Sequence, residues 1–200
     1  MEQREQHSSL VKRSTPIYLA MVIFGLIASK YLHKNLSEIF SLPTSTEEWQ
    51  NLICVTALGS GIIAITHQFG RLSSSYPSYK KWVAELLGPL SFPTAVYLAV
   101  ISSLGEELFF RVSMQPYVGV LWTSILLAIL QLTPQGFMPI WLLIGLINNL
   151  TVGFIYHYTG SLLPPLLIHL VITSTSFLSH AYRSRNFSNP NLRKQNDRSL

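Results

Sequence analysis

Long apolar runs alternate with short polar stretches along the whole chain. A helix needs about 20 residues, within a range of about 17 to 25, to cross the hydrocarbon core of a bilayer. Each run of this kind must be helical, because lipid offers no partner to backbone polar groups and the runs lack the short alternation of barrel strands. The pattern predicts an all-α fold, a polytopic membrane helix bundle of about six transmembrane helices, at residues 17–33, 51–69, 86–110, 117–133, 138–158 and 162–181.

Prolines lie mostly at the starts or ends of these runs, where a missing backbone N–H costs little. Pro93 is the exception because it lies inside the run at 86–110. It predicts a bend in the third helix.

The basic residues gather in three of the polar stretches. Loops rich in Lys and Arg resist translocation and stay on the cytoplasmic side. The stretch at 34–50 instead carries Glu38, Glu47 and Glu48. We therefore expect both termini to be cytoplasmic, on the same side as the loop after the second helix. The basic residues concerned are Arg4, Lys12, Arg13, Arg71, Lys80, Lys81, Arg183, Arg185, Arg193, Lys194 and Arg198.

The composition agrees with a membrane protein. Charged residues make up 12% of the chain, against about 25% in soluble domains, and the mean hydropathy is +0.34. Attraction to anionic membrane lipid accounts for the net charge of +5. No aromatic and basic groove favours nucleic acid as a partner. The one cysteine, Cys54, lies in an apolar run and is expected to be a free thiol in the core.

We divide the chain into three parts. Residues 1–85 form an N-terminal tail and two transmembrane helices, residues 86–181 a core, and residues 182–200 a basic tail that is expected to be disordered. The first run has an alternative interpretation as a signal peptide, because Lys12 and Arg13 precede it and small residues, Ala28 and Ser29, end it.

Three charges stand in the third run, and they are the only formal charges between Leu86 and Ala181. Glu107 and Arg111 are four residues apart with the acid first, the favourable order for an ion pair on a helix. Glu106 lies about 100° around the helix from Glu107 and is left without that partner. It either faces a polar cavity and transfers protons, or lies at the membrane interface with its carboxylate in the headgroup layer.

Other polar side chains lie inside the later runs, among them Gln131, Asn148 and Asn149. His169 and Thr173 are four residues apart and so share one helix face. For each of these alone, the alternative interpretation is a hydrogen bond between helices. A carboxylate and an imidazole in one small bundle instead favour a pair that activates water.

The order of these residues resembles the CPBP family of intramembrane proteases, which includes CAAX prenyl proteases, bacteriocin-processing enzymes and abortive-infection relatives. The resemblance runs from Leu86 to Ser179 and rests on the Glu-Glu-x-x-x-Arg pattern of residues 106–111 and on "TGSL" at 159–162, which leads to His169. The sequence departs from the family pattern at two positions. Gln131 stands where the family has a second histidine, and Thr173 stands where it has an asparagine.

The resemblance implies a role for each matched position. Glu106 is expected to be the general base and His169 the retained imidazole, so these two are the candidate catalytic residues. Glu107 and Arg111 are expected to support the site. Gln131 cannot exchange a proton at neutral pH, and Thr173 offers one hydroxyl donor in place of an amide.

These expectations lead to two hypotheses of function. The first is an intramembrane endopeptidase that hydrolyses a peptide bond of a peptide or protein substrate with a Glu-activated water. The second is a pseudoprotease that binds a peptide or partner protein in the same cavity. A small transporter is a third class, without the inverted repeat that would support it. No metal or other cofactor is expected, because one histidine with carboxylates lacks the three ligands typical of catalytic zinc.

Overall fold

The computed structural model describes residues 2–32, 35–130 and 139–187. Helices and short links make up these ranges, and no strand occurs within them, so the all-α prediction is confirmed. In chain order the elements are α1 (Glu2–Tyr31), α2 (Leu36–Phe40), α3 (Thr46–Arg71), α4 (Tyr76–Leu87), α5 (Phe92–Glu106), η1 (Glu107–Met114), α6 (Gln115–Leu130), α7 (Pro139–Thr159) and α8 (Leu163–Phe187).

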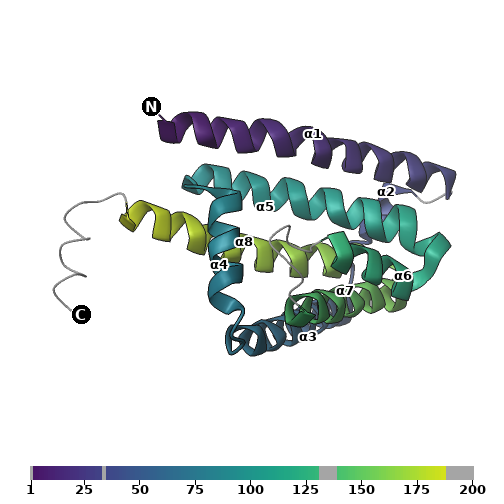
Figure 1. Cartoon of the computed structure of the whole chain (residues 1–200). Coiled ribbons are helices and arrows are strands. Elements are labelled where there is room, and N and C mark those ends of the chain that lie inside the picture. The colour runs from purple at the N-terminus through teal and green to yellow at the C-terminus, as the bar shows by residue number, and fades with distance from the viewer. Residues whose placement is uncertain (1, 33–34, 131–138, 188–200) are drawn as a thin grey trace.

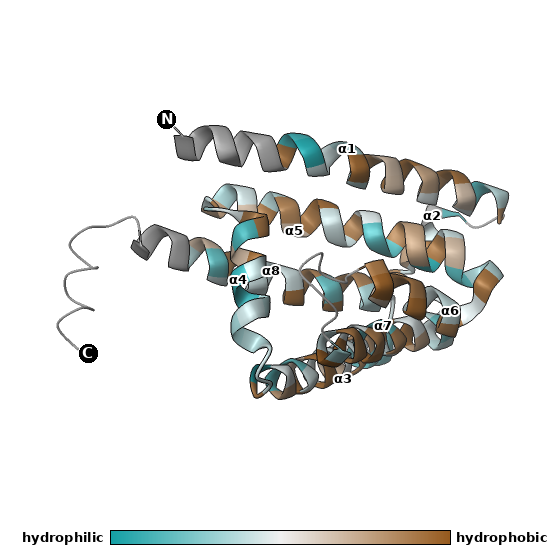
Figure 2. Cartoon of the chain, in the orientation of Figure 1, coloured by the Kyte–Doolittle hydropathy of each residue, from teal (hydrophilic) through white to brown (hydrophobic). Residues whose placement is uncertain are grey.

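Five helical runs in the described part of the chain are long and apolar enough to cross a membrane. Their ribbons are coloured largely as hydrophobic in Figure 2, and many of their large apolar side chains, such as Phe24, Ile53 and Trp122, are exposed. Such an outer surface is stable in lipid and not in water. The protein is therefore an integral membrane protein. The runs are Val11–Tyr31, Thr46–Arg71, Phe92–Leu130, Pro139–Thr159 and Leu163–Tyr182.

The third and fourth predicted helices form one continuous run, from Phe92 to Leu130, which bends at Gly119. The backbone of Gly119 has φ 78° and ψ 170°, a conformation that glycine alone adopts without strain. Beyond this residue the chain turns back, and α6 packs along α7 (Figure 1). The prediction of a bend at Pro93 was wrong. Pro93 lies in the first turn of α5, where its missing N–H needs no partner.

The helices form a bundle in which α5 and η1 occupy the middle (Figure 1). α1 packs on α5 and η1, α8 packs on the other side of α5, and α3 packs against α7 and α8. The short helix α4 crosses from the end of α3 to the start of α5 (Figure 1). α1 begins and α8 ends at the same end of the bundle.

Two glycines bring α1 close to the middle of the bundle. A Cβ atom on Gly25 would lie 2.7 Å from Cβ of Leu108, and one on Gly105 would lie 3.0 Å from the carbonyl oxygen of Tyr18. Such close backbone approach is how helices associate in membranes, where burial of apolar surface gives no advantage over lipid. The contact fixes α1 beside Glu106, which follows Gly105.

Two details differ from the sequence predictions. Cys54 is a free thiol but lies exposed on α3, because this outer helix buries only a narrow stripe of small and apolar residues. The N-terminal tail is helical from Glu2, since its Glu, Gln, Lys and Arg residues favour helix and extend α1 beyond its apolar part. Of the C-terminal tail, residues 188–200 lie outside the described ranges.

Candidate functional site

The three charges of the third run lie where α5 changes into a wider helix. Glu106 ends α5, and η1 from Glu107 to Met114 is π-helical. Such π-helical turns are rare and occur frequently at functional sites. Glu107 and Arg111 therefore lie in the π-helical stretch, and Glu106 directly precedes it.

Glu107 and Arg111 form an ion pair inside the bundle, as their spacing predicts. Arg111 Nε donates a hydrogen bond to Glu107 Oε2 at 3.2 Å. The two side chains are 1% exposed for Arg111 and 4% for Glu107. Because both charges are out of solvent and lipid, the pair is a fixed internal brace and does not reach the interface.

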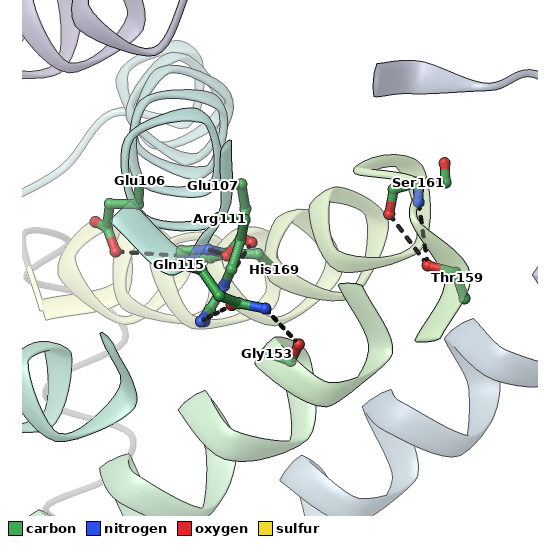
Figure 3. Close-up of polar contacts among 8 residues, drawn as sticks. All are labelled: Glu106, Glu107, Arg111, Gln115, Gly153, Thr159, Ser161 and His169. Carbon is green, nitrogen blue, oxygen red and sulfur yellow. Dashed lines mark hydrogen bonds and ion pairs between the residues drawn. The ribbon is translucent and has the colours of Figure 1, made fainter. Parts of the chain in front are cut away.

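His169 reaches this pair from α8. Its Nδ1 lies 2.8 Å from Glu107 Oε1, and its Nε2 lies 3.8 Å from Glu106 Oε2 (Figure 3). A carboxylate held by an arginine only accepts hydrogen bonds. Nδ1 of His169 therefore carries a proton and donates a hydrogen bond to Glu107. The other ring nitrogen, Nε2, is then the atom turned toward Glu106.

Sequence reasoning assigned Glu107 to Arg111 alone, whereas the structure also joins it to His169. Glu107 uses one carboxylate oxygen for each partner. Only the tertiary contact between η1 and α8 creates the second bond, since the two residues are 62 positions apart.

Glu106 and His169 are the accessible members of the cluster. Their side chains are 24% and 22% exposed, several times more than those of Glu107 and Arg111. The buried pair is neutral as a unit. The exposed part of the cluster is therefore the carboxylate of Glu106 and the imidazole of His169.

Gln115 extends the cluster, and sequence reasoning missed it. Its Oε1 accepts a hydrogen bond from Arg111 Nη1 at 3.3 Å, and its Nε2 donates to the carbonyl oxygen of Gly153 on α7 at 2.9 Å (Figure 3). The signal was the regular spacing, since Glu107, Arg111 and Gln115 follow one another at intervals of four residues.

The "TGSL" stretch forms the turn between α7 and α8 and sets the direction in which α8 begins. Gly160 adopts φ 66°, which ends α7. Thr159 Oγ1 accepts a hydrogen bond from the Ser161 N–H (Figure 3). Ser161 Oγ accepts one from the Leu163 N–H at the start of α8. The Leu162 N–H donates to the Ile39 carbonyl oxygen at 2.7 Å. This turn fixes the start of the helix that carries His169.

The remaining polar candidates have different surroundings. Thr173 lies one turn beyond His169 and makes no hydrogen bond to the cluster within the described part of the chain, and Gln131 lies outside the described residues. Asn148 accepts a hydrogen bond from Thr66 Oγ1 at 2.7 Å, which joins α7 to α3. Asn149 is buried on the face of α7 that also holds Gly153, and its Nδ2 has no hydrogen-bond partner among the residues that the structure describes.

Two further features bear on the chemistry. No group of three or more His, Cys, Asp or Glu side chains within the described ranges could hold a metal ion, and the absence of a cofactor stays a prediction.

An apolar groove of about 460 Å³ lies between α1 and the bend at Gly119, with Phe24, Tyr31 and Tyr117 in its walls. The residues of the charged cluster do not line it.

The fold and the site thus define a class: an integral membrane helix bundle with a carboxylate and an imidazole held over a buried ion pair. Residues 88–175 match the family described as type II CAAX prenyl endopeptidase Rce1-like. This match supports the resemblance to the CPBP family of intramembrane proteases that the sequence motifs indicated. The matched range contains every candidate site residue.

One curated relative is the uncharacterized protein YpbD of Bacillus subtilis (strain 168), which is 29% identical over 91 residues. The alignment covers 44% of this chain and 46% of that protein, so the chain spans about half the length of this relative. No solved structure matches the chain.

Proposed function

We propose that the protein is an intramembrane endopeptidase in which Glu106 activates the water that attacks the peptide bond. One observation carries the proposal: the accessible Glu106 and His169 face each other across 3.8 Å, above the buried pair of Glu107 and Arg111. The match of residues 88–175 to a protease family supports it and implies a peptide or protein substrate in a membrane setting.

The distance between Glu106 and His169 suits a water bound by both. It is too long for a direct hydrogen bond, and a water at about 2.8 Å from each atom would sit at the apex of a triangle over them. The Glu106 carboxylate accepts a proton from this water while the water oxygen bonds to the carbonyl carbon. The C–N bond then breaks, and the amine leaves with the proton that Glu106 took from the water.

The roles of the other residues follow from their burial. Glu107 and Arg111 do not reach a substrate and instead hold the His169 ring. Thr173 is the candidate donor to the oxyanion, since its hydroxyl lies one helical turn beyond the imidazole.

The test uses the purified protein in lipid nanodiscs and a fluorogenic, prenylated CAAX-type peptide. Glu106→Gln removes the base but keeps the shape of the side chain, and it should lower the cleavage rate by about 100- to 10,000-fold. Glu38→Gln is the control, because Glu38 is an exposed carboxylate on α2 that bonds Asn35 and should leave the rate unchanged. Equal cleavage by the parent and Glu106→Gln would refute the mechanism.

A pseudoprotease is the second candidate. It is favoured by Thr173, which stands in place of the family's asparagine and makes no hydrogen bond to the cluster within the described residues. An inactive parent that gains cleavage in the double variant Gln131→His with Thr173→Asn would establish this alternative. A parent that already turns over would exclude it.

A further inference from the structure

A continuous line of hydrogen bonds crosses the bundle from α7 to α8. It starts at the Gly153 carbonyl oxygen, passes through Gln115, Arg111 and Glu107, and ends at His169 Nδ1 (Figure 3). Every bond in it is between 2.8 and 3.3 Å. The side chains between the two ends are at most 5% exposed, so solvent cannot replace a lost partner.

Gln115 is the point at which this line is attached to the backbone. Arginine only donates hydrogen bonds and a carbonyl oxygen only accepts them, so the side chain between Arg111 and Gly153 needs both an acceptor and a donor. The glutamine amide supplies one of each in a fixed plane. Its two partners also fix which way the amide is turned, with Oε1 toward Arg111 and Nε2 toward Gly153.

Gly153 makes the attachment possible because it has no side chain. A Cβ atom at this position would lie 3.2 Å from Arg111 Nη1 and 3.3 Å from Gln115 Oε1. The backbone of α7 can therefore approach both groups only at a glycine. The contact gives Arg111 a second hydrogen-bond partner, opposite the one it makes with Glu107.

We propose that Gln115 is a positioning residue that acts through Arg111 and Glu107 to keep Nε2 of His169 directed at Glu106. Without Gln115, Arg111 is held at Glu107 alone and can rotate about its long side chain. Glu107 then loses its fixed orientation, and the imidazole is free to place its proton on either ring nitrogen. For its effect on cleavage this inference rests on the proposed function, whereas its effect on the imidazole does not depend on any activity.

The direct readout is the ¹⁵N NMR spectrum of the histidine ring nitrogens in nanodiscs, with His169 assigned by His169→Gln. In the parent, Nδ1 of His169 should carry a proton at every pH at which the spectrum is recorded. In Gln115→Met, which keeps the length of the side chain but removes both hydrogen bonds, a fraction of the protein should show an unprotonated Nδ1. Asn148→Leu is the matched control, because it removes one hydrogen bond between α7 and α3 without touching the cluster.

Gly153→Ala is a second, independent variant for the case in which Gln115→Met does not fold. Alanine favours helix over glycine, while its methyl group would crowd Arg111 and Gln115. It should produce the same unprotonated Nδ1. The inference is overturned if both variants keep the parent's His169 spectrum, or if the parent itself lacks a proton on Nδ1.

The cleavage assay separates this inference from the proposed function. With an active parent, Gln115→Met should lower kcat by about 10- to 100-fold and leave KM unchanged, because Gln115 does not reach the substrate. An inactive parent would refute the proposed function, and the NMR result would still decide the role of Gln115. An unchanged kcat together with an unchanged spectrum would refute the inference alone.

Discussion

Arg111 shows at the scale of a single residue why a charge can stay inside a membrane protein. It is 1% exposed, and its guanidinium group binds a carboxylate on one side and an amide oxygen on the other. Its charge is thus neutralised and its hydrogen bonds are made within the bundle. Within the described residues, the accessible carboxylate of Glu106 makes no ion pair with an arginine, and we propose that it is the catalytic base.

Removal of this arginine should therefore destabilise the protein. In Arg111→Met, the buried charge of Glu107 loses the cation that neutralises it, although the hydrogen bond from His169 remains. The free energy of unfolding should fall by about 3 to 5 kcal/mol. The measurement is thermal unfolding in detergent. The double variant Glu107→Gln with Arg111→Met should recover much of the loss, because no buried charge remains. A single variant as stable as the parent would show that the pair is not a brace.

At the scale of the helix, the run from Phe92 to Leu130 depends on the bend at Gly119. A continuous helix of this length would extend well beyond the hydrocarbon core. The bend returns α6 to α7 and brings Gly153 to the face where Arg111 and Gln115 lie.

Substitution of Gly119 should be costly for conformational reasons alone. Nothing lies within 4 Å of a Cβ atom at this position, so Gly119→Ala introduces no clash. The backbone conformation is nevertheless strained for alanine by about 1 to 3 kcal/mol, which should appear as a lower unfolding temperature. Gly61→Ala, in a helix with equally open space, should be neutral or stabilising. Equal effects of the two substitutions would contradict the role of the bend.

The close packing of α1 on η1 is a second feature at the scale of the helix. A side chain at Gly25 would meet Leu108 at 2.7 Å, and part of that contact is backbone. Gly25→Val should push α1 away and lower the free energy of unfolding by about 1 to 3 kcal/mol. Thermal unfolding measures the effect, again with Gly61→Ala as the control. A fully stable Gly25→Val would mean that α1 is not packed as described.

At the scale of the whole molecule, the match to the type II CAAX prenyl endopeptidase family covers residues 88–175, while α1, α2, α3 and α4 lie before it. These earlier helices still contribute to the site. α1 packs beside Glu106, and Ile39 of α2 accepts a hydrogen bond from the turn that starts α8. The core is therefore held in place by helices outside the matched range.

The orientation in the membrane is a prediction of the same scale. Basic residues should keep both termini and the link between α3 and α4 on the cytoplasmic side. In a Cys54→Ser background, Ser41→Cys should react with a membrane-impermeant maleimide added to intact cells. Ser74→Cys should react only after the cells are permeabilised. The reverse labelling pattern would show that the protein has the opposite orientation in the membrane.

The amino-acid sequence by itself determined the fold class, the approximate spans and the identity of the three central charges. These follow from local rules: the length of an apolar run, the four-residue spacing of Glu107 and Arg111, and the order of motifs around His169. Only the tertiary structure decided that Glu107 binds His169, that Gln115 holds Arg111, and that the chain bends at Gly119 and not at Pro93. These depend on contacts between helices far apart in the sequence and on one backbone conformation, and hydropathy and spacing along a single helix contain neither.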